Sequence, residues 1–413
     1  MLVATKVKLY PNQAQKVLLE KHFGSNRFVY NYFLAKRDEY YIKHKNAKKL
    51  SLSYLDTQQM LIRLKQEYPW LYEVNSQSLQ MSLRFLDNAF KNFFHKNTDH
   101  PKFRKKGKHD YFAVPQHVKI KYNRIYFPKF SEGIYFKGSE NKLNEIKSIN
   151  QIVIKKEAGY YFCSIQYEVE AKAPKQKLMS ESSVGIDLGI EKFATLSNGL
   201  SIENPRFLFK LEKRIKRLQK QLSKKIKGSN NRLKTILKLQ KVYMKLRNER
   251  KDFQDKVSTV IAKQYDTIII ESLNIQRMQQ SHIAHIAHIA KEITDTSFYT
   301  FKERLKWKAE KYGKNVIEIG KFEPSSKLCS RCGNIKHNLR LSDRIYCCDV
   351  CGLVTDRDYN AAKNIRKIGL IKVGLVQPEF TPVETATSSL QGLYPYKQMS
   401  VVEAGSSKSF IAS

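Results

Sequence analysis

The sequence lacks any long apolar segment, although 41% of its 413 residues are hydrophobic. No apolar run approaches the roughly 20 residues that a helix needs to cross a bilayer. The first residues, Met1 to Lys6, also lack the apolar core of a secretion signal. We therefore expect a soluble, cytoplasmic protein without a membrane partner. Its length predicts about two to four compact units rather than one.

Acidic residues are scarce compared with basic ones. Lysine and arginine number 75, aspartate and glutamate number 38, and the net charge is +37. Such an excess is most stable beside a polyanion, which inside a cell is usually nucleic acid. The alternatives are a basic surface that serves only solubility and an anionic membrane, but no amphipathic anchor is evident. The charge therefore favours a protein that binds nucleic acid.

Cysteine is also sparse, but four of the six residues follow a metal-ligand spacing. Cys329 and Cys332 enclose two residues, as do Cys348 and Cys351, and 15 residues separate the two pairs. A glycine follows each pair, as a tight knuckle turn requires. In an intracellular protein this spacing favours a structural zinc ribbon with four cysteine ligands over disulfides. Cys347 lacks the two-residue gap to Cys351, so Cys348 is the expected ligand.

The amino-terminal part is expected to combine strands with helices. A strand from Leu2 to Leu9 precedes helices that continue to about Phe94. Short strands with alternating apolar residues are expected from 118 to 169, with Cys163 on the apolar side. A small antiparallel barrel or sandwich fits best, and the helices then form an insertion within it. The last helix should bury a face made of Leu79, Leu83, Leu86, Phe90 and Phe93.

Two segments concentrate positive charge. Residues 100–108 hold five cations, which predicts a phosphate-binding loop, although a solvated loop fits equally well. Residues 210–251 hold 17 Lys or Arg against two Glu, and their leucine spacing predicts a helical hairpin that breaks at Gly228. A solvated coiled coil is the alternative, but charge of one sign repels itself unless phosphates lie alongside. The apolar stripe should resume at Leu233, Ile236, Leu239, Val242 and Leu246. The candidate nucleic-acid-binding residues are Lys102, Arg104, Lys105, Lys106, Lys108, Arg214, Arg217, Lys224 and Lys225.

Three acids accompany the elements of a predicted central sheet. Asp187 lies in an apolar strand that opens an antiparallel meander, in which Asn198-Gly199 predicts a type I′ hairpin turn. Glu271 ends the aliphatic run 267–271, which suits a strand buried on both faces. Asp358 falls in the first turn of a later helix.

The elements between these acids complete the pattern. A helix is expected from about Thr294 to Tyr312 with Gly313 as its stop, followed by a strand from Asn315 to Glu318. A single acid at a strand end or helix start is usually a cap or a solvated residue. Three acids on this strand order form a much stronger signal.

Phosphodiester hydrolysis would explain the three acids. Two Mg²⁺ ions about 4 Å apart can activate water and neutralise charge on the attacking and leaving oxygens. Mg²⁺ prefers oxygen ligands and keeps several waters, so a few converging carboxylates suffice. Asp187, Glu271 and Asp358 are therefore the candidate catalytic residues and Mg²⁺ ligands.

Six segments, in order over roughly residues 1 to 370, carry a family resemblance. They are Ala4–Pro11, Phe23–Asn31, Gly185–Gly189, Ile270–Asn274, Pro324–Gly333 and Asp356–Ile365. Together they resemble the TnpB (OrfB) proteins of insertion sequences, which are relatives of the type V CRISPR nucleases. The resemblance implies a RuvC-like nuclease domain with Asp187, Glu271 and Asp358 as metal ligands, and an RNA from the element that guides DNA cleavage. Ser272 departs from the family, which commonly has Asp after the catalytic Glu.

With this resemblance, the predicted fold is α+β and multidomain. It comprises a RuvC-like (RNase H-like) α/β nuclease core with an inserted four-cysteine zinc ribbon, and an N-terminal β-barrel (wedge) domain that carries an inserted helical recognition lobe. The expected boundaries are 1–10 and 101–175 for the wedge barrel, 11–100 for the lobe, 176–324 and 355–370 for the nuclease, 205–262 for its basic hairpin, 325–354 for the ribbon and 371–413 for a disordered tail. A linker is expected at 171–182.

The first functional hypothesis is an RNA-guided DNA endonuclease of a transposable element, acting as a monomeric ribonucleoprotein at the prokaryotic nucleoid. Its cofactors would be structural zinc, two Mg²⁺ ions and the guide RNA, and target DNA would be its other partner. A silent RNA-guided DNA-binding regulator is the second hypothesis, and the intact acids argue against it. A transposase is the third. No His-x-His pair occurs for single-strand transposition, but an acid-dependent transposase stays open. The repeat His282, His285, His288 favours a mobile segment over a metal site.

Overall fold

The computed structural model describes residues 2–44, 51–137, 146, 148–169, 180–272, 296–320, 323–340 and 342–376. The chain divides into two compact units. One consists of Met1–Ala171 with Phe209–Asn248, and the other of Lys172–Leu208 with Glu249–Ser413. No helix among the described residues is both long enough and apolar enough to cross a membrane.

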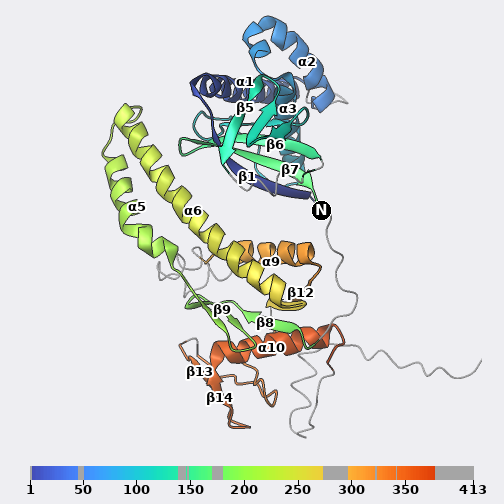
Figure 1. The fold of residues 1–413 in the computed structure, drawn as a ribbon, viewed down its shortest axis with the longest axis vertical. Coiled ribbons are helices and arrows are strands. Elements are labelled where there is room, and N and C mark those ends of the chain that lie inside the picture. Colours follow the sequence, from blue (N-terminus) through green and yellow to red (C-terminus); the bar gives the residue numbers. More distant parts are fainter. Residues whose placement is uncertain are drawn as a thin grey trace, which may run out of the picture. The chain divides into compact units, whose positions relative to one another are not determined.

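The first unit contains a seven-stranded sheet in the order β2-β6-β7-β1-β5-β4-β3, with every pairing antiparallel (Figure 1). Its strands are β1 (Leu2–Tyr10), β2 (Tyr111–Val114), β3 (Lys119–Lys121), β4 (Arg124–Phe127), β5 (Phe130–Lys137), β6 (Ile149–Glu157) and β7 (Tyr160–Glu168). The first strand of the sequence thus lies in the middle of the sheet, between β7 and β5. The remaining strands come only after the helices, as an insertion requires.

The sheet's core follows the alternation of its strands. Along β7, partly exposed and buried residues alternate, and Cys163 and Ile165 are fully buried on the inner face. Successive side chains of a strand point to opposite faces, so a period of two identifies the buried side. The expected strand texture of this segment and the core position of Cys163 are confirmed.

Helices α1 (Gln13–Lys43), α2 (Tyr54–Glu67) and α3 (Ser76–Phe94), with the short 3-10 helix η1 (Pro69–Glu73), form the insertion. Asn12 starts α1 through a capping box, because its side chain accepts from the Gln15 N–H and the Gln15 side chain accepts from the Asn12 N–H. The predicted face of α3 is buried, with Leu79, Leu83 and Leu86 fully inaccessible. Helical residues therefore extend to Phe94, as expected.

The second unit is built on a five-stranded sheet in the order β10-β9-β8-β11-β12. Its strands are β8 (Ser183–Asp187), β9 (Lys192–Leu196), β10 (Ser201–Glu203), β11 (Thr267–Glu271) and β12 (Asn315–Ile319). The strands β8, β11 and β12 are parallel, whereas β9 and β10 are antiparallel to their neighbours. The predicted meander and the central buried strand are both present.

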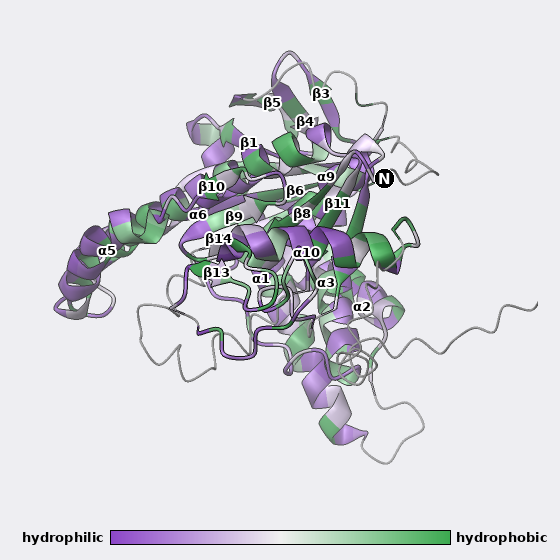
Figure 2. Ribbon diagram, turned by 90° about the horizontal axis from the view of Figure 1, so that it is seen from below, coloured by the Kyte–Doolittle hydropathy of each residue, from purple (hydrophilic) through white to green (hydrophobic). Residues whose placement is uncertain are grey.

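Helices α9 (Phe298–Tyr312) and α10 (Arg357–Lys372) cover opposite faces of this sheet. Ile268 and Ile270 of β11 belong to the core that includes α9, whereas Ile269 belongs to the core that includes α10. Neighbouring strand residues point to opposite faces, so the two helices lie on different sides. Figure 2 shows β8 and β11 as largely hydrophobic, in keeping with a doubly covered sheet. Gly313 ends α9 in the left-handed region, as predicted.

The turn between β9 and β10 differs from the prediction. A type I′ turn needs positive φ at both central residues, but Gly199 (φ +93°) is in this region and Asn198 is not. The Gly199 N–H instead donates to Leu196 O, and the Leu196 N–H donates to Leu200 O. This arrangement is a three-residue loop with glycine at its left-handed position, so the type I′ prediction was wrong.

The basic hairpin consists of α5 (Phe207–Ser223) and α6 (Asn230–Gln264), and Gly228 adopts φ +87° in the turn. Purple hydrophilic and green hydrophobic residues alternate along both helices in Figure 2. The apolar stripe holds at Val242 and Leu246, which are buried. The prediction of this stripe was wrong at Leu233, which is 56% exposed, whereas Thr235 is buried.

Several expectations concern the ends of segments. Helix α10 continues to Lys372, and Leu375 and Val376 pack against its core, so the tail predicted from residue 371 begins too early. Residues 377–413, most of the linker 171–182 and the repeat His282 to His288 lie outside the described residues.

Candidate active site and cysteine cluster

Two of the predicted acids are brought together by the register of parallel strands. Ile270 of β11 is paired with Ile186 of β8. Asp187 and Glu271 each follow by one residue and end their strands. Parallel strands end at the same edge of a sheet, so both carboxylates lie at this edge. Each is partly buried, in contrast to the fully buried residue before it.

The third acid reaches this edge on α10. Asp356 caps the helix by accepting from the Tyr359 N–H at 2.9 Å, and Asp358 lies in the first turn. The helix packs closely on β8, since a Cβ added to Gly185 would lie 2.2 Å from Ala362 O. Any larger residue in place of Gly185 would push α10, and Asp358 with it, away from the sheet. This close approach explains the glycine two residues before Asp187.

The three acids interact electrostatically. Burial, and then the charges of Asp358 and Glu271, raise the pKa of Asp187 from 3.8 to about 7. The pKa of Glu271 is raised by burial, against a hydrogen bond from Ser325 that lowers it. The pKa of Asp358 is raised by burial and then by Asp356, while Arg344, Lys192 and Arg357 oppose this. Asp187 is therefore at the centre of a cluster of like charges.

Such a cluster has the donor set that a hard divalent cation needs. Carboxylate oxygens are the preferred protein ligands of Mg²⁺. Like charges at close range destabilise one another unless protons or cations neutralise them. The pKa of Asp187 is raised first by burial and then by this repulsion from Asp358 and Glu271. On chemical and electrostatic grounds Asp187, Glu271 and Asp358 are candidate ligands of a divalent cation, although within the described residues only four cysteines form a group whose ligand atoms all lie within 4.8 Å of one another.

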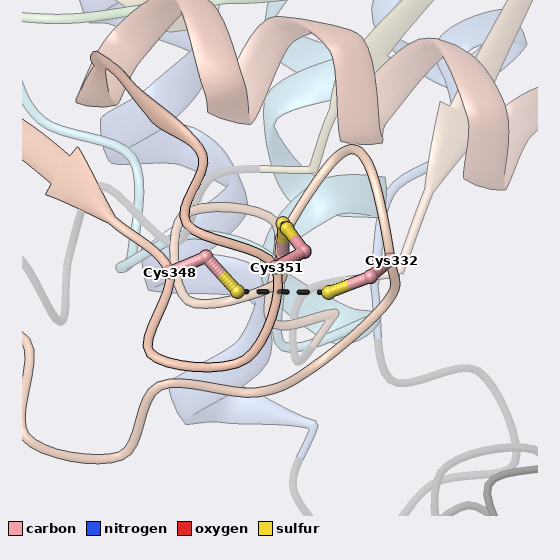
Figure 3. Close-up of side chains that lie close together, drawn as sticks. Cys332, Cys348 and Cys351 are labelled. Carbon is pink, nitrogen blue, oxygen red and sulfur yellow. Dashed lines mark hydrogen bonds between the residues drawn. The ribbon is translucent and has the colours of Figure 1, made fainter.

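The four predicted cysteines converge in the same unit. The Sγ atoms of Cys329, Cys332, Cys348 and Cys351 all lie within 4.8 Å of one another. The Cys329–Cys351 and Cys332–Cys348 pairs of Sγ atoms are each 3.5 Å apart. Four thiolates at about 2.3 Å from a tetrahedral Zn²⁺ would be roughly 3.8 Å apart. Cys332 and Cys348 point toward each other from two turns (Figure 3). The geometry of the four cysteines suits one metal ion.

Two knuckle turns shape this cluster. The Gly333 N–H donates to Cys329 O at 3.0 Å, and the Gly352 N–H donates to Cys348 O at 3.1 Å. Both glycines have positive φ, a backbone conformation that residues with a side chain rarely adopt. Cys347 is exposed on β13 (Ile345–Cys347), which pairs with β14 (Val354–Asp356), and it is not part of the cluster. Cys348, and not Cys347, therefore lies with the other three cysteines.

The basic loop 100–108 is divided into exposed and buried cations. Lys102, Lys105, Lys106 and Lys108 are exposed. Arg104 is only 8% exposed, and its guanidinium lies over the Tyr30 ring at 3.7 Å and the Tyr111 ring at 4.7 Å. Arg104 therefore does not fit the prediction of a phosphate contact. Its position is that of an anchor for the loop, because cation–π stacking is strong when desolvated.

The anchoring of this loop continues through its backbone. The Asn31 side chain donates to Arg104 O at 3.0 Å and accepts from the Arg104 N–H at 2.7 Å. Asp110 accepts from the Gly107 N–H and pairs with Arg27. The four lysines are therefore presented from a loop with a defined backbone.

The hairpin cations are similarly mixed. Arg214, Arg217 and Lys224 are exposed. Lys225 donates to Asn231 O at 3.2 Å and to Thr235 Oγ1 at 2.7 Å. Lys225 thus holds the turn of the hairpin in addition to any contact with phosphate.

Sequence reasoning missed three polar residues around the acids. Ser325, Asn360 and Asn364 are buried, and each bonds within the second unit. A signal existed for two of them, since asparagine is a poor residue for a helix interior and these two are four positions apart in a predicted helix. Ser325 carried no signal of its own.

Three family models match the chain. Residues 164–282 match a model described as a probable transposase (OrfB_IS605), and residues 298–365 match a Cas12f1-like TNB domain. Residues 1–46 match a model described as a helix-turn-helix domain. Within residues 2–44 the structure has the strand β1 and the single helix α1, so no helix-turn-helix is formed there.

Curated relatives match over nearly the full length. A protein of Escherichia coli (strain K12) named "Putative RNA-guided DNA endonuclease InsQ" is 32% identical over 89% of this chain and 92% of its own length. This chain belongs to the TnpB (OrfB) family. A second family member, the "Putative RNA-guided DNA endonuclease" of Streptomyces pristinaespiralis, is 31% identical over 94% of this chain and 95% of its own.

A more distant relative extends the comparison beyond these proteins. The CRISPR-associated endodeoxyribonuclease Cas12f1 of Sulfoacidibacillus thermotolerans is 27% identical over 53% of this chain and 52% of its own length. The resemblance to the TnpB family that the sequence motifs carried is confirmed.

Proposed function

We propose that this TnpB-family chain is an RNA-guided DNA endonuclease that hydrolyses phosphodiester bonds of its target. The observation that carries the proposal is that Asp187 and Glu271 end neighbouring parallel strands, while the charge of Asp358 on α10 acts on Asp187. Two relatives that match nearly the whole chain are named as RNA-guided DNA endonucleases. The names of these relatives indicate the reaction, and the three acids are chemical groups that could perform it.

In this proposal the second unit is the RuvC-like (RNase H-like) nuclease core. The support is its mixed sheet, in which three parallel strands continue into an antiparallel meander, together with the helices on both faces. The antiparallel sheet of the first unit would form the wedge barrel, and α1 to α3 the recognition lobe. The insertion of these helices between β1 and β2 supports this division.

The proposed ligands of two Mg²⁺ ions are Asp187, Glu271 and Asp358. Bound there, Mg²⁺ would activate water and neutralise charge on the attacking and leaving oxygens. The protein contributes the fixed positions of the acids, because β8 and β11 are held in register and α10 packs on them. The four cysteines would hold Zn²⁺, and a closed four-sulfur site is structural.

The proposed partners are a guide RNA and target DNA. The net charge of +37 and the exposed cations of two regions support a long phosphate-binding surface. Base pairing with the guide would read the target sequence, while the protein contacts the backbone. Proposed phosphate contacts are Lys102, Lys105, Lys106, Lys108, Arg214, Arg217, Lys224 and Lys225.

The proposal can be tested with the full chain and the RNA that copurifies with it. Sequencing that RNA identifies a guide segment, and a DNA duplex containing the matching sequence is then supplied with Mg²⁺. We expect cleavage of the matching duplex and none of a scrambled one, and no cleavage when Mg²⁺ is omitted. Equal cleavage of both duplexes would contradict guidance by RNA, and cleavage without a divalent cation would contradict the metal-ion mechanism.

A further inference from the structure

One short segment connects the cysteine cluster to the candidate active site. Residues 325–330 lead into the first knuckle turn and end beside Cys329. The Asn360 side chain donates to Leu328 O at 2.7 Å and accepts from the Ser330 N–H at 3.0 Å. Helix α10 therefore binds the backbone on both sides of a metal-binding cysteine.

A second asparagine on the same helix repeats the contact. The Asn364 side chain donates to Ser325 O at 2.7 Å and to Leu328 O at 2.6 Å. Asn360 and Asn364 are one helical turn apart, so they share a face. They are 0% and 1% exposed. A buried amide is costly unless it is hydrogen-bonded, and asparagine is a poor helix former, so packing alone does not account for these residues.

The opposite side of α10 is held by the sheet. A Cβ on Gly185 would lie 2.2 Å from Ala362 O, and a Cβ on Gly369 would lie 2.4 Å from a methyl carbon of Ile269. The helix is thus clamped between the strands that end in Asp187 and Glu271 and the segment that leads to Cys329. Asp358, two residues before Asn360, has its place determined by this clamp.

The same segment also contacts a second acid directly. Ser325 is 5% exposed, and its hydroxyl donates to Glu271 Oε2 at 3.5 Å. Its backbone oxygen meanwhile accepts from Asn364. Ser325 therefore links Glu271 to the helix that carries Asp358. This link lies beside the candidate metal site and is anchored by the fold of the cysteine cluster.

We infer that the cysteine cluster positions the carboxylate site through Asn360, Asn364 and Ser325. These three are positioning residues, and through them the binding of a metal by the four cysteines raises the affinity of the three acids for divalent cations. The inference rests on the proposed function, because it takes Asp187, Glu271 and Asp358 to be cation ligands. Partners of this outer kind commonly change metal affinity by about 10- to 100-fold when removed.

The test measures Mn²⁺ binding to the full chain by the loss of the free-ion electron paramagnetic resonance signal. Binding at the candidate site is the part of the Mn²⁺ binding that is lost in the Asp187→Asn variant. We expect Asn360→Ala and Asn364→Ala each to weaken this binding by about tenfold, with the zinc content unchanged. Lys363→Ala is the matched control, since Lys363 lies on the same helix and is partly exposed. It should leave Mn²⁺ affinity at the wild-type value.

A purely structural clamp would give a different result. Asn360→Ala would then lower the melting temperature while the folded protein bound Mn²⁺ as tightly as the wild type, and this result would overturn the inference. If the asparagine variants fail to fold, Ser325→Ala tests the positioning role, because it removes only the hydroxyl contact with Glu271. We expect it to weaken Mn²⁺ binding in the same direction, and unchanged affinity would contradict the inference.

Failure of the proposed function looks different again. If the wild-type chain bound no Mn²⁺ that depends on Asp187, both the proposed function and this inference would be wrong. If it bound Mn²⁺ and cut DNA while all three variants kept wild-type affinity, only the positioning role would be lost.

Discussion

The cysteine cluster and the carboxylate cluster lie in the same unit, yet they are built in different ways. The cysteines fall within residues 329–351 and are brought together by two local turns. The acids come from residues 187, 271 and 358, and only strand register and the packing of α10 bring them towards the same part of the sheet. One cluster therefore depends on short-range geometry, and the other on the whole fold of the unit.

The two clusters also differ in their chemistry. Four thiols form a closed set of soft ligands that can surround one ion completely. The three carboxylates are hard groups that, around a Mg²⁺ ion, would leave coordination positions for water or substrate. Burial, and then the charges of Asp358 and Glu271, raise the pKa of Asp187 to about 7, so a bound cation would stabilise its ionised form. A structural site and a catalytic site are expected to differ in these ways.

The largest expected effect is the loss of cleavage when the central acid is neutralised. Asp187→Asn keeps the size of the side chain but removes one charged ligand, so we expect target cleavage to fall by about 10³-fold or more. Zinc content and binding of the guide RNA should be unchanged. The measurement compares single-turnover cleavage rates, and a variant that cuts at the wild-type rate would remove Asp187 from the active site.

The next largest effect distinguishes the roles of the adjacent residues Cys347 and Cys348 in zinc binding. Cys348→Ser removes one thiolate from the closed set, and we expect the bound zinc, measured by elemental mass spectrometry, to fall well below one ion per chain. Structural zinc binding typically contributes about 10 kcal/mol or more to the fold of a small lobe. Cys347→Ser is the control, because Cys347 is exposed and outside the cluster. Equal zinc loss in both variants would contradict the ligand assignment.

A smaller effect concerns stability and pH in the absence of Mg²⁺. The folded chain raises the pKa of Asp187 from 3.8 to about 7. Between these values the folded state holds a proton that the unfolded chain has lost, so rising pH destabilises the fold. The contribution is at most about 4 kcal/mol.

The measurement is the stability of the wild type minus that of Asp187→Asn, obtained by urea unfolding from pH 4 to 7 with zinc retained. This difference should decrease as the pH rises, and added Mg²⁺ should flatten the curve because the cation replaces the proton. A difference that increased with pH would contradict the raised pKa.

The smallest effect distinguishes two acids at the start of α10. Asp356 accepts from the Tyr359 N–H as the helix cap, so Asp356→Ala should cost about 1 kcal/mol of stability. Its cleavage rate should stay within a few-fold of the wild type. Asp358→Ala should show the reverse, with abolished cleavage and little loss of stability. If Asp356→Ala also abolished cleavage while α10 stayed folded, Asp356 would belong to the metal site.

Much of the local structure could be predicted from the sequence. Apolar periodicity located α3 and β7, the aliphatic run 267–271 located the central strand, and cysteine spacing selected Cys348. These signals are local, because a helix or strand that buries one face repeats its apolar residues at a fixed interval. Motif resemblance also pointed to the three acids before any geometry was known.

Other features were decided only by the tertiary structure. Arg104 lies in a run of cations, but Tyr30 and Tyr111 bury it, and both come from elsewhere in the sequence. The hydrogen bonds of Asn360 and Asn364 to residues 325–330 likewise have no local pattern. The sequence determined which residues could form helices, strands and metal ligands. The tertiary structure decided which charges became buried anchors and which acids act on one another, because these outcomes depend on contacts between residues far apart in the chain.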